Sequence, residues 1–466
     1  MARRGSAMAR PLQRAKREVI VKTHASAAPA GKARRFPAPL ALAALAAVLA
    51  ARPAGAQATS DRVPATRTQT PAALVEADLQ QNRYHLGPIR LFPFLQVDNA
   101  GYNDNIFGTA DHKVADETAD VSAGARLLLP VGSKIFLRGT AAPEYIWYAK
   151  HPDGRTWGGD YEGEFLALFN HLRIDADARD LKTASLLSAE TLRNVVSRAR
   201  IGRASGEVDV AGPVSLFGAG ETSKYGFRAI PRPSEPLEDP ALLDRKEEEI
   251  RAGVRVHAAE RLSFSAAAEK TRAVFDDPAQ GGDNRSVAYL LGVRIDTPRF
   301  FANLSGGYRD AKPIHASRFR EFRTATGSYF LSFLARGSVE LFADGFRGAQ
   351  YSVTVENPYY MATVNGGGVN VQVGPRLALR AYADYDENRY PITVVVDGAG
   401  YRRLDKITSY GGGFQVLAGR KLGIGIFGTE YHFDSNVPGI ARNVFRLTAF
   451  VSFQLSPIVS IRTGLS

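Results

Sequence analysis

The sequence predicts an all-β fold: a single transmembrane antiparallel β-barrel of about eighteen strands, with sixteen strands as the alternative. Apolar and polar residues alternate with a period of two from Ile89 to Leu455, which places them on opposite faces of a sheet. The alternating stretches run about ten residues or more, whereas strands of soluble domains cluster near five or six. Short and long connectors take turns between them. In lipid such a sheet must close, because lipid cannot satisfy an open sheet edge.

Residues 1–56 are predicted to be a signal peptide with a long basic first region. They hold eleven Lys and Arg residues and a single acid, Glu18. The apolar run LALAALAAVLAA follows, and AGA at 54–56 supplies the small residues of a cleavage site. The run is too short to cross a bilayer as a helix, although an N-terminal membrane anchor is the alternative. We therefore expect export across the inner membrane and location in the bacterial outer membrane.

The rest of the chain has nearly balanced charge. Residues 57–466 carry 48 basic and 46 acidic residues, so the formal charge of +12 belongs mainly to the leader. We therefore expect no nucleic-acid partner. The chain has no cysteine, which excludes disulfides, thiolate metal sites and a Cys nucleophile. Residues 57–88 are polar and are predicted to form a periplasmic lead-in, with a short helix near AALVEADLQQN.

The barrel is predicted to occupy residues 89–455, and connector length supports the assignment. Short connectors include PVGS at 130–133, AGP at 211–213 and GPR at 374–376. Long polar loops lie between them, including LKTASLLSAETLRN and NRYPITVVVDGAGYRRLD. Tight turns at one end and long loops at the other are typical of outer-membrane barrels. Residues 456–466 alternate again after the last strand, and are predicted to be a tail or an extra strand.

Tyr and Phe residues gather near strand ends. The pairs Tyr145/Tyr148, Tyr359/Tyr360, Tyr382/Tyr385 and Tyr431/Phe433 are examples. We expect them to form aromatic girdles at the two membrane interfaces.

Charged residues that alternate with apolar neighbours should point into the lumen. Eighteen strands enclose a space too wide for side chains to fill, so we favour a water-filled channel over a wall of ion pairs that merely fills the barrel. Acids at 160, 162, 164, 247 and 249 share the predicted inward face. The main predicted lumen-lining residues are Arg126, Arg138, Glu144, Arg173, Asp175, Asp177, Arg179, Arg251, Arg255, Arg294, Arg309, Arg380 and Asp384.

The sequence offers little support for catalysis, and we expect neither an enzyme nor a cofactor. No HExxH motif and no phosphate-binding GxxxxGK[ST] loop occurs. Two histidines have an acid or Ser close by in the sequence: His151 beside Asp153, and His432 beside Asp434 and Ser435. Such neighbours are common by chance in polar strand ends. We therefore expect no catalytic residue and no metal ligand.

The stretch NAGYNDNIFG, residues 99–108, is rich in oxygen ligands but lacks the D-x-[DN]-x-[DN]-G spacing of a calcium loop. We expect it to end the first strand, with turn geometry supplied by its Asn and Asp residues. Tyr102, Ile106 and Phe107 would then lie near the membrane interface. The residues of this motif are Tyr102, Asn103, Asp104, Asn105, Ile106 and Phe107.

This motif and YHFDSNVPGIARNVFRLTAFVSF near the C-terminus resemble the opening and closing segments of a family of outer-membrane β-barrel porins, the β-barrel porin 2 type. Members of that family are found with exopolysaccharide and exosortase gene clusters. The resemblance spans residues 89–455, although the chain continues to Ser466 without a terminal aromatic residue. It assigns no catalytic residue.

The resemblance implies a barrel that takes part in export or assembly of a cell-surface polysaccharide. Its partners would be outer-membrane lipid, the polysaccharide and periplasmic export machinery. Two alternatives stay open: a general diffusion porin for small solutes, and a structural surface barrel that conducts nothing.

Overall fold

The computed structural model describes residues 75–454, except 77, 80–83, 232–238, 315–317 and 420, and it leaves the side chain of residue 279 undescribed. All described residues belong to one unit. The predicted signal peptide, most of the lead-in and the tail at 456–466 lie outside the described residues. In the described part, no helix is long and apolar enough to cross a membrane.

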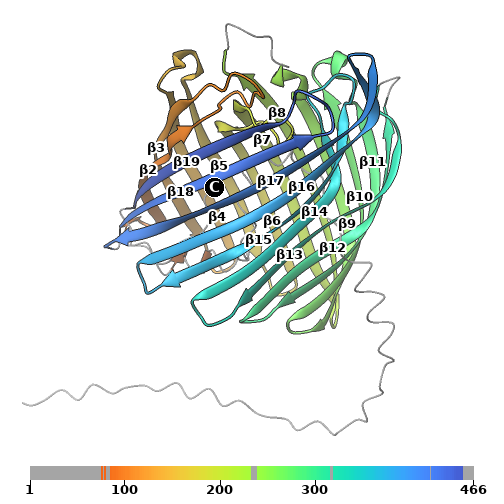
Figure 1. Ribbon diagram of the computed structural model, residues 1–466. Helices are drawn as coiled ribbons and strands as arrows, with labels where there is room; N and C mark the ends of the chain where they lie inside the picture. Colours follow the sequence, from red (N-terminus) through yellow and green to blue (C-terminus); the bar gives the residue numbers. More distant parts are fainter. Residues whose placement is uncertain are drawn as a thin grey trace, which may run out of the picture. The chain divides into compact units, whose positions relative to one another are not determined.

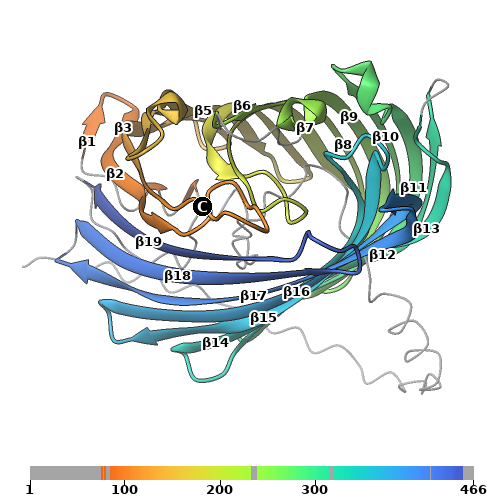
Figure 2. The ribbon, with the colours of Figure 1, turned by 45° about the horizontal axis from the view of Figure 1, so that its top comes forward.

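Eighteen long strands form one closed antiparallel ring (Figures 1 and 2), in which each strand pairs with its neighbours in sequence. The last strand returns to the first long strand, with Thr448 opposite Gly101 and Gln454 opposite Phe94, and this pairing closes the barrel. The predicted all-β barrel of eighteen strands is therefore confirmed, and the sixteen-strand alternative is wrong. One further strand was not predicted: β1 is three residues long and pairs with the start of β2.

The strands are β1 (Tyr84–Leu86), β2 (Ile89–Asn103), β3 (Asp116–Val131), β4 (Ile135–Tyr148), β5 (Thr156–Leu168), β6 (Leu172–Leu186), β7 (Asn194–Ala211), β8 (Val214–Ala229), β9 (Arg245–Ala259), β10 (Leu262–Phe275), β11 (Asn284–Asp296), β12 (Phe300–Pro313), β13 (Phe322–Leu334), β14 (Val339–Tyr351), β15 (Tyr359–Val373), β16 (Leu377–Val396), β17 (Ala399–Ala418), β18 (Leu422–Ser435) and β19 (Arg442–Gln454). Three short 3₁₀ turns lie in the long connections: η1 (Pro152–Gly154), η2 (Pro240–Leu243) and η3 (Pro278–Gln280).

One segment that the sequence predicts to be a long polar loop is a β-hairpin. The segment NRYPITVVVDGAGYRRLD extends β16 and β17, which pair up to Val396 opposite Ala399. Asp397 and Gly398 form the tight turn between them, both with positive φ. Asp-Gly favours this kind of two-residue hairpin turn, and the β-branched run before it favours a strand.

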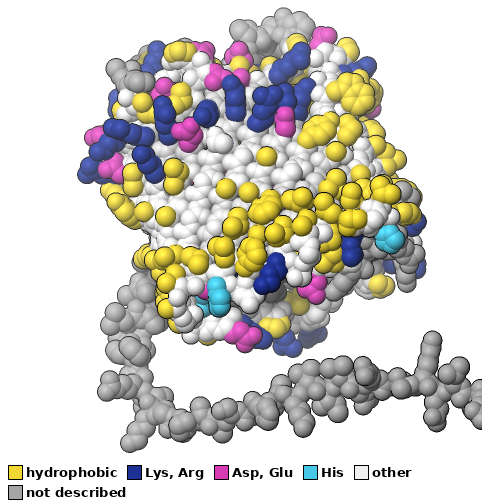
Figure 3. All heavy atoms as spheres, turned by 180° about the vertical axis from the view of Figure 1, so that it is seen from behind, with side chains coloured by type: hydrophobic (Ala, Val, Ile, Leu, Met, Phe, Trp, Pro, Cys, Tyr) yellow, Lys and Arg dark blue, Asp and Glu magenta, His cyan; other side chains and the backbone are white. Residues whose placement is uncertain are grey.

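The outward face of the sheet carries an apolar belt. Large apolar side chains are exposed at alternate positions along most strands, as at Leu291, Phe333 and Leu379. Ile250 is 67% exposed and Leu291 61%. A water-soluble protein rarely exposes apolar side chains over so wide a surface. Figure 3 shows this belt as a band of apolar side chains across the barrel.

The predicted aromatic girdle is only partly correct. Tyr148, Tyr360 and Phe433 are buried on the inward side, among other apolar residues. Tyr385 is exposed on the outward face. Other exposed aromatic residues were missed, including Trp157 and Tyr289. A strand end can place an aromatic ring on either face, so position along the strand does not determine the side.

A β-bulge in β2 sets the orientation of the opening motif. The register between β2 and β3 shifts between Asp98 and Gly101, and Asn99 takes a positive φ of 49°. Asn99 Nδ2 donates to Asp120 Oδ2 at 2.7 Å, which holds the bulge in place. The extra residue reverses the alternation beyond it. Tyr102 consequently faces outward, 42% exposed, while Asn103 is buried.

Candidate functional site

The β6–β7 connection, residues 187–193, folds inward and is called the inner loop below. Leu187 lies in a buried cluster with Phe227 of β8 and Val353, which follows β14. Leu192 lies in a different cluster with Ile407 of β17 and Phe433 of β18. β8 is the neighbour of β7, but β14, β17 and β18 stand well apart from β6 and β7 in the ring order. The inner loop therefore reaches across the barrel and narrows it at the end that carries the long loops.

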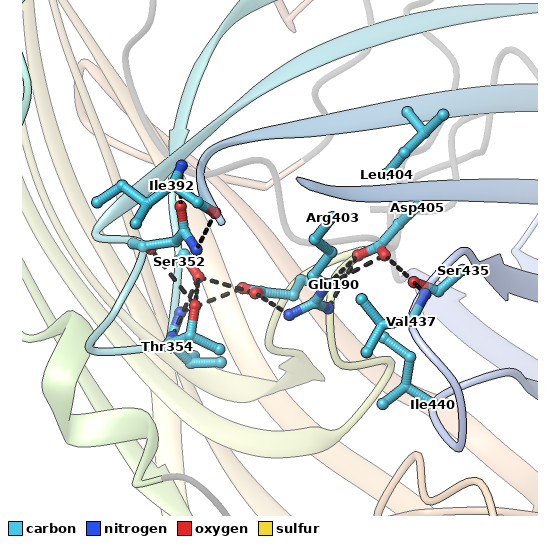
Figure 4. A network of polar contacts seen from close by, with 12 residues as sticks. Glu190, Ser352, Thr354, Ile392, Arg403, Leu404, Asp405, Ser435, Val437 and Ile440 are labelled. Carbon is cyan, nitrogen blue, oxygen red and sulfur yellow. Dashed lines mark hydrogen bonds and ion pairs between the residues drawn. The ribbon is translucent and has the colours of Figure 1, made fainter. Parts of the chain in front are cut away.

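Glu190 is the polar anchor of the inner loop (Figure 4). Ser352 Oγ donates to its Oε1 at 2.7 Å, and the backbone N–H of Val353 donates to its Oε2 at 3.1 Å. Arg403 Nη1 of β17 lies 3.4 Å from Oε1. Arg442 of β19 donates to the Glu190 carbonyl oxygen. One residue of the inner loop thus bonds to three other parts of the barrel.

The network continues beyond Arg403 to the last hairpin. Arg403 Nη2 pairs with Asp405 Oδ2 at 2.8 Å, and Ser435 Oγ donates to Asp405 Oδ1 at 2.7 Å. The Arg403 guanidinium also lies over the Tyr390 ring, 4.3 Å from its centroid. Because Arg403 is shared between two buried carboxylates, losing one of them leaves its charge partly paired.

Burial raises the pKa of the Glu190 carboxyl above its ordinary value. The Arg403 guanidinium, the Ser352 hydroxyl and the Val353 N–H act in the opposite direction but do not cancel the effect of burial. The inner loop therefore carries a buried carboxyl group whose pKa lies above its ordinary value.

The loop that receives Glu190, residues 352–358, is itself fixed. Asn357 Nδ2 donates to the carbonyl of Ile392 at 3.1 Å, and the Ile392 N–H donates back to Asn357 Oδ1 at 2.8 Å. Gln280 Nε2 bonds to the carbonyls of Ser352 and Pro358. The inner loop is thus docked on a rigid surface.

The opening motif also folds inward and supports the inner loop. Ile106 is fully buried and Phe107 is 2% exposed, in a cluster with Ile146 and Tyr148. The expectation that Ile106 and Phe107 lie at the membrane interface is therefore wrong. The N–H of Asn194, where β7 begins, donates to the Ile106 carbonyl at 2.8 Å.

The expected turn chemistry of the motif is present. Asn103 Oδ1 accepts from the N–H of Asn105 at 2.8 Å. Asn105 Nδ2 in turn donates to the Thr109 carbonyl at 2.8 Å. Asp104 Oδ1 accepts from the N–H of Phe445 and so ties the turn to the strand that closes the ring. The Asn and Asp side chains of the motif thus form hydrogen bonds with backbone groups of the turn and of β19.

At the opposite end of the barrel, the segment before β1 contacts the inner wall. Val75 and Leu79 are helical, as the lead-in prediction proposed for this region, and they pack with Phe92, Leu128 and Phe136. The neighbouring Asp78 Oδ2 lies 3.7 Å from Arg138 Nε, and Arg90 donates to the Leu79 carbonyl.

The register places the predicted lumen residues on the face opposite the apolar belt, and ion pairs join several of them. Arg138 pairs with Glu164 at 2.5 Å, and Arg179 with Asp160 at 2.7 Å. Arg309 Nη2 pairs with Glu269 Oε1 at 2.5 Å, and Arg251 bonds to the other oxygen of Glu269. Arg255 pairs with Glu207 at 2.5 Å, and Arg294 with Asp296 at 3.2 Å.

Other predicted lumen residues make different contacts. Arg126 lies over Phe92 and Arg380 over Phe342. Ser409 donates to Asp384, and Thr183 donates to Glu144. Arg173, Asp175 and Asp177 of β6 stand opposite Glu207, Ser205 and Arg203 of β7.

Acids exceed bases on this face of the described strands. The registers place the acids Asp98, Asp116, Asp120, Glu144, Asp160, Glu162, Glu164, Asp175, Asp177, Glu207, Asp209, Glu221, Glu247, Glu249, Glu269, Asp296, Glu340, Asp344, Asp384, Asp386 and Asp405 there. The bases on the same face are Arg90, Arg126, Arg138, Arg173, Arg179, Arg203, Arg245, Arg251, Arg255, Arg294, Arg309, Arg380, Arg403, Arg442 and Arg446. The inner loop contributes one acid, Glu190, and one base, Arg193, both buried, so it leaves the excess of acids unchanged. A lumen of this kind attracts cations.

The two histidine pairings lie in different surroundings. His151 Nδ1 is 2.6 Å from Asp116 Oδ2, and Phe107 packs edge-on against the His151 ring. Asp116 Oδ1 also accepts from the N–H groups of Glu117 and Lys150, so it fixes a loop. His432 lies on the outward face with Glu430 and Tyr410. Across the described residues, no group of three or more His, Cys, Asp or Glu is arranged to hold a metal ion.

No protein-family model and no curated protein sequence matches the chain. Solved structures that resemble it include OccK9 (OpdG) of Pseudomonas aeruginosa, with 13% identity over 78% of this chain and 98% of that one, at a TM-score of 0.46. OccK2 (OpdF) of the same organism, solved with glucuronate, has 12% identity over 78% and 98%, at 0.47. The P. aeruginosa outer membrane protein OpdK has 10% identity over 78% and 98%, at 0.46. Likeness at this level concerns the fold, and nothing about solutes follows from it.

Proposed function

We propose that the protein is an outer-membrane channel for small solutes and that it prefers cations to anions. The observation that carries this proposal is a closed eighteen-strand ring whose inward face is lined by charges of both signs with acids in excess. Such a lumen holds water, because fixed charges are too costly to leave dry. Its field concentrates cations and repels anions.

The apolar belt supports placement in a membrane. Exposed Leu, Phe and Ile side chains alternate with the charged inward face around the ring, as expected for a barrel with lipid outside and water inside. The outer membrane is the bacterial membrane in which barrels of this kind occur, so the predicted location follows from the architecture.

The inner loop supports a small solute over a polymer. It is anchored through Glu190 to the 352–358 loop and to Arg403, so at this level the loop occupies part of the space that the ring encloses. A polysaccharide chain would have to displace this anchored loop. Export of polysaccharide stays a prediction that rests on the motif resemblance, and none of the comparisons lends it support.

Liposome swelling tests the proposal. Liposomes that contain the purified barrel should swell rapidly in lysine or arginine, more slowly in glutamate of similar size, and not in a long oligosaccharide. Empty liposomes and liposomes with heat-denatured protein are the controls. Equal swelling in cationic and anionic solutes would contradict the charge preference, and absence of swelling in every solute would contradict the channel.

A further inference from the structure

The outward face carries a group of cations that neither the lumen nor the belt explains. Lys224, Lys246, Arg272, Arg285 and Lys312 lie on five consecutive strands, β8 to β12, and are called the basic band. All five side chains are exposed. They occur near the ends of these strands that join the long loops. Figure 3 shows Lys and Arg side chains gathered toward one rim, beside the apolar belt.

The register sets like charges directly opposite each other. Lys224 stands opposite Lys246. Arg285 stands opposite Arg272 on one side and opposite Lys312 on the other. Directly opposed side chains on one face have Cβ atoms only about 4.5–5.5 Å apart, and like charges there are destabilising. The fold does not require this arrangement, since neutral polar residues would satisfy the same exposed positions.

Carboxylates of the chain neutralise the basic band only in part. Lys224 lies 3.2 Å from Asp276, and Lys246 lies 2.7 Å from Glu248. Arg272 reaches Glu248, which stands opposite it on β9, only at 3.9 Å, and Lys312 reaches Asp310 only at 3.9 Å. These pairs are about half exposed and therefore weak. Among the described residues, Arg285 at the centre of the band forms no ion pair within 4 Å.

The position of the band identifies the kind of anion that fits it. On the same face of β11, Arg285 is followed by Val287, Tyr289 and Leu291, which are exposed members of the belt. A partner that covers both features must join phosphate groups to several acyl chains at the level of the headgroups. Arg binds phosphate through paired N–H donors. On the side of the long loops, the lipid with this chemistry is lipid A, the acylated disaccharide bisphosphate of lipopolysaccharide.

We propose that the basic band is a binding site for the phosphate groups of lipid A, whose acyl chains lie on the apolar belt beside it. The inference rests on the outer-membrane placement in the proposed function but not on conduction. Bound phosphates bridge the opposed cations, so the repulsion within the band becomes attraction to the lipid.

Binding of labelled lipid A to the purified barrel in detergent tests this site. The variant R272Q/R285Q removes the central pair of opposed charges. The matched control is R389Q/K406Q on β16 and β17, where exposed outward cations stand beside or opposite Glu387. We expect at least a tenfold loss of affinity in R272Q/R285Q and no loss in the control. Dephosphorylated lipid A should bind poorly to the unsubstituted protein.

The unfolding temperature distinguishes loss of the lipid site from a folding defect. Without lipid, R272Q/R285Q should unfold at the same temperature as the unsubstituted barrel or higher, because repulsion has been removed. Added lipid A should raise the unfolding temperature of the unsubstituted barrel and not that of the variant. Unchanged binding in R272Q/R285Q, or equal binding of dephosphorylated lipid A, would overturn the proposal. Competition by inorganic phosphate at millimolar concentration would show a plain anion site and would overturn it too.

The two proposals can fail separately. If the barrel conducts no ions but binds lipid A through the band, only the proposed function is wrong. If it conducts normally while the band variant binds lipid A unchanged, only the lipid site is wrong.

Discussion

Replacing Glu190 with alanine should release the inner loop and enlarge the channel. The substitution removes the acceptor for the Ser352 hydroxyl, the Val353 N–H and the Arg403 guanidinium. The bond from Arg442 to the carbonyl of residue 190 survives, because alanine keeps that carbonyl. The apolar contacts of Leu187 and Leu192 also remain.

The size of the effect follows from these contacts. A buried donor left without an acceptor costs about 1–3 kcal/mol. The lower end applies here, because Arg403 keeps Asp405 and Ser352 keeps a contact with Thr354. Three donors then weaken docking by about 3 kcal/mol. At about 1.4 kcal/mol for each factor of ten, the ratio of released to docked loop rises on the order of a hundredfold.

Single-channel recording in planar bilayers measures this ratio. Glu190→Ala should open frequently to a conductance level above that of the unsubstituted protein. Glu430→Ala removes a carboxylate of the outward face, 35% exposed, and should leave conductance unchanged. Heat-modifiable migration on gels shows that both variants form the barrel. A folded Glu190→Ala variant with unchanged conductance levels would show that Glu190 does not hold the inner loop in the channel.

Three further predictions concern the same loops. Burial raises the pKa of Glu190 above its ordinary value of 4.5. Docking of the inner loop is therefore most favourable below about pH 4.5 and weakens as the pH rises through the raised pKa. Conductance should therefore be lower at acid pH, and Glu190→Gln should remove the dependence; a pH response that persists in this variant would assign it to another group. Gly108 has φ of +60°, and a Cβ there would lie 2.1 Å from the Thr191 carbonyl oxygen. Gly108→Ala should lower the unfolding temperature measured by heat modifiability. Gly212→Ala should lower it less, because Gly212 has a similar φ of +51° but open space around it. Equal losses would mean that backbone strain, and not the clash with Thr191, causes the loss of stability. Phe107→Ala should cost about 3–5 kcal/mol of local packing, seen as faster hydrogen exchange in residues 104–115 and 187–193, and unchanged exchange would contradict the packing role of the motif.

The barrel was predictable because period-two alternation is a local property. Each strand of a closed barrel needs an apolar outward face, so the neighbours of Arg138 or Arg251 already indicate on which face they lie. The bulge at Asn99 was not predictable from alternation, and it decides which way Asn103 points. The hairpin at Asp397 and Gly398 carried a readable turn signal, which the polar residues around it obscured.

The anchored inner loop could not have been derived in the same way. Glu190, Ser352 and Arg403 are more than 50 residues apart from one another, and only closure of the ring brings them together. A weak local signal did exist. The connection after β6 carries Leu187 and Leu192, and two leucines in a connector between strands suggest a buried loop. No feature of the nearby sequence identifies the residues on β8, β17 and β18 that these leucines contact.

The most direct test of the central claim is the ion current through the purified protein in a planar bilayer with a salt gradient across it. We expect stepwise currents of uniform size and a reversal potential whose sign shows that cations pass more readily than anions. A bilayer that takes up the folded barrel and carries no current, or a reversal potential of the opposite sign, would contradict it.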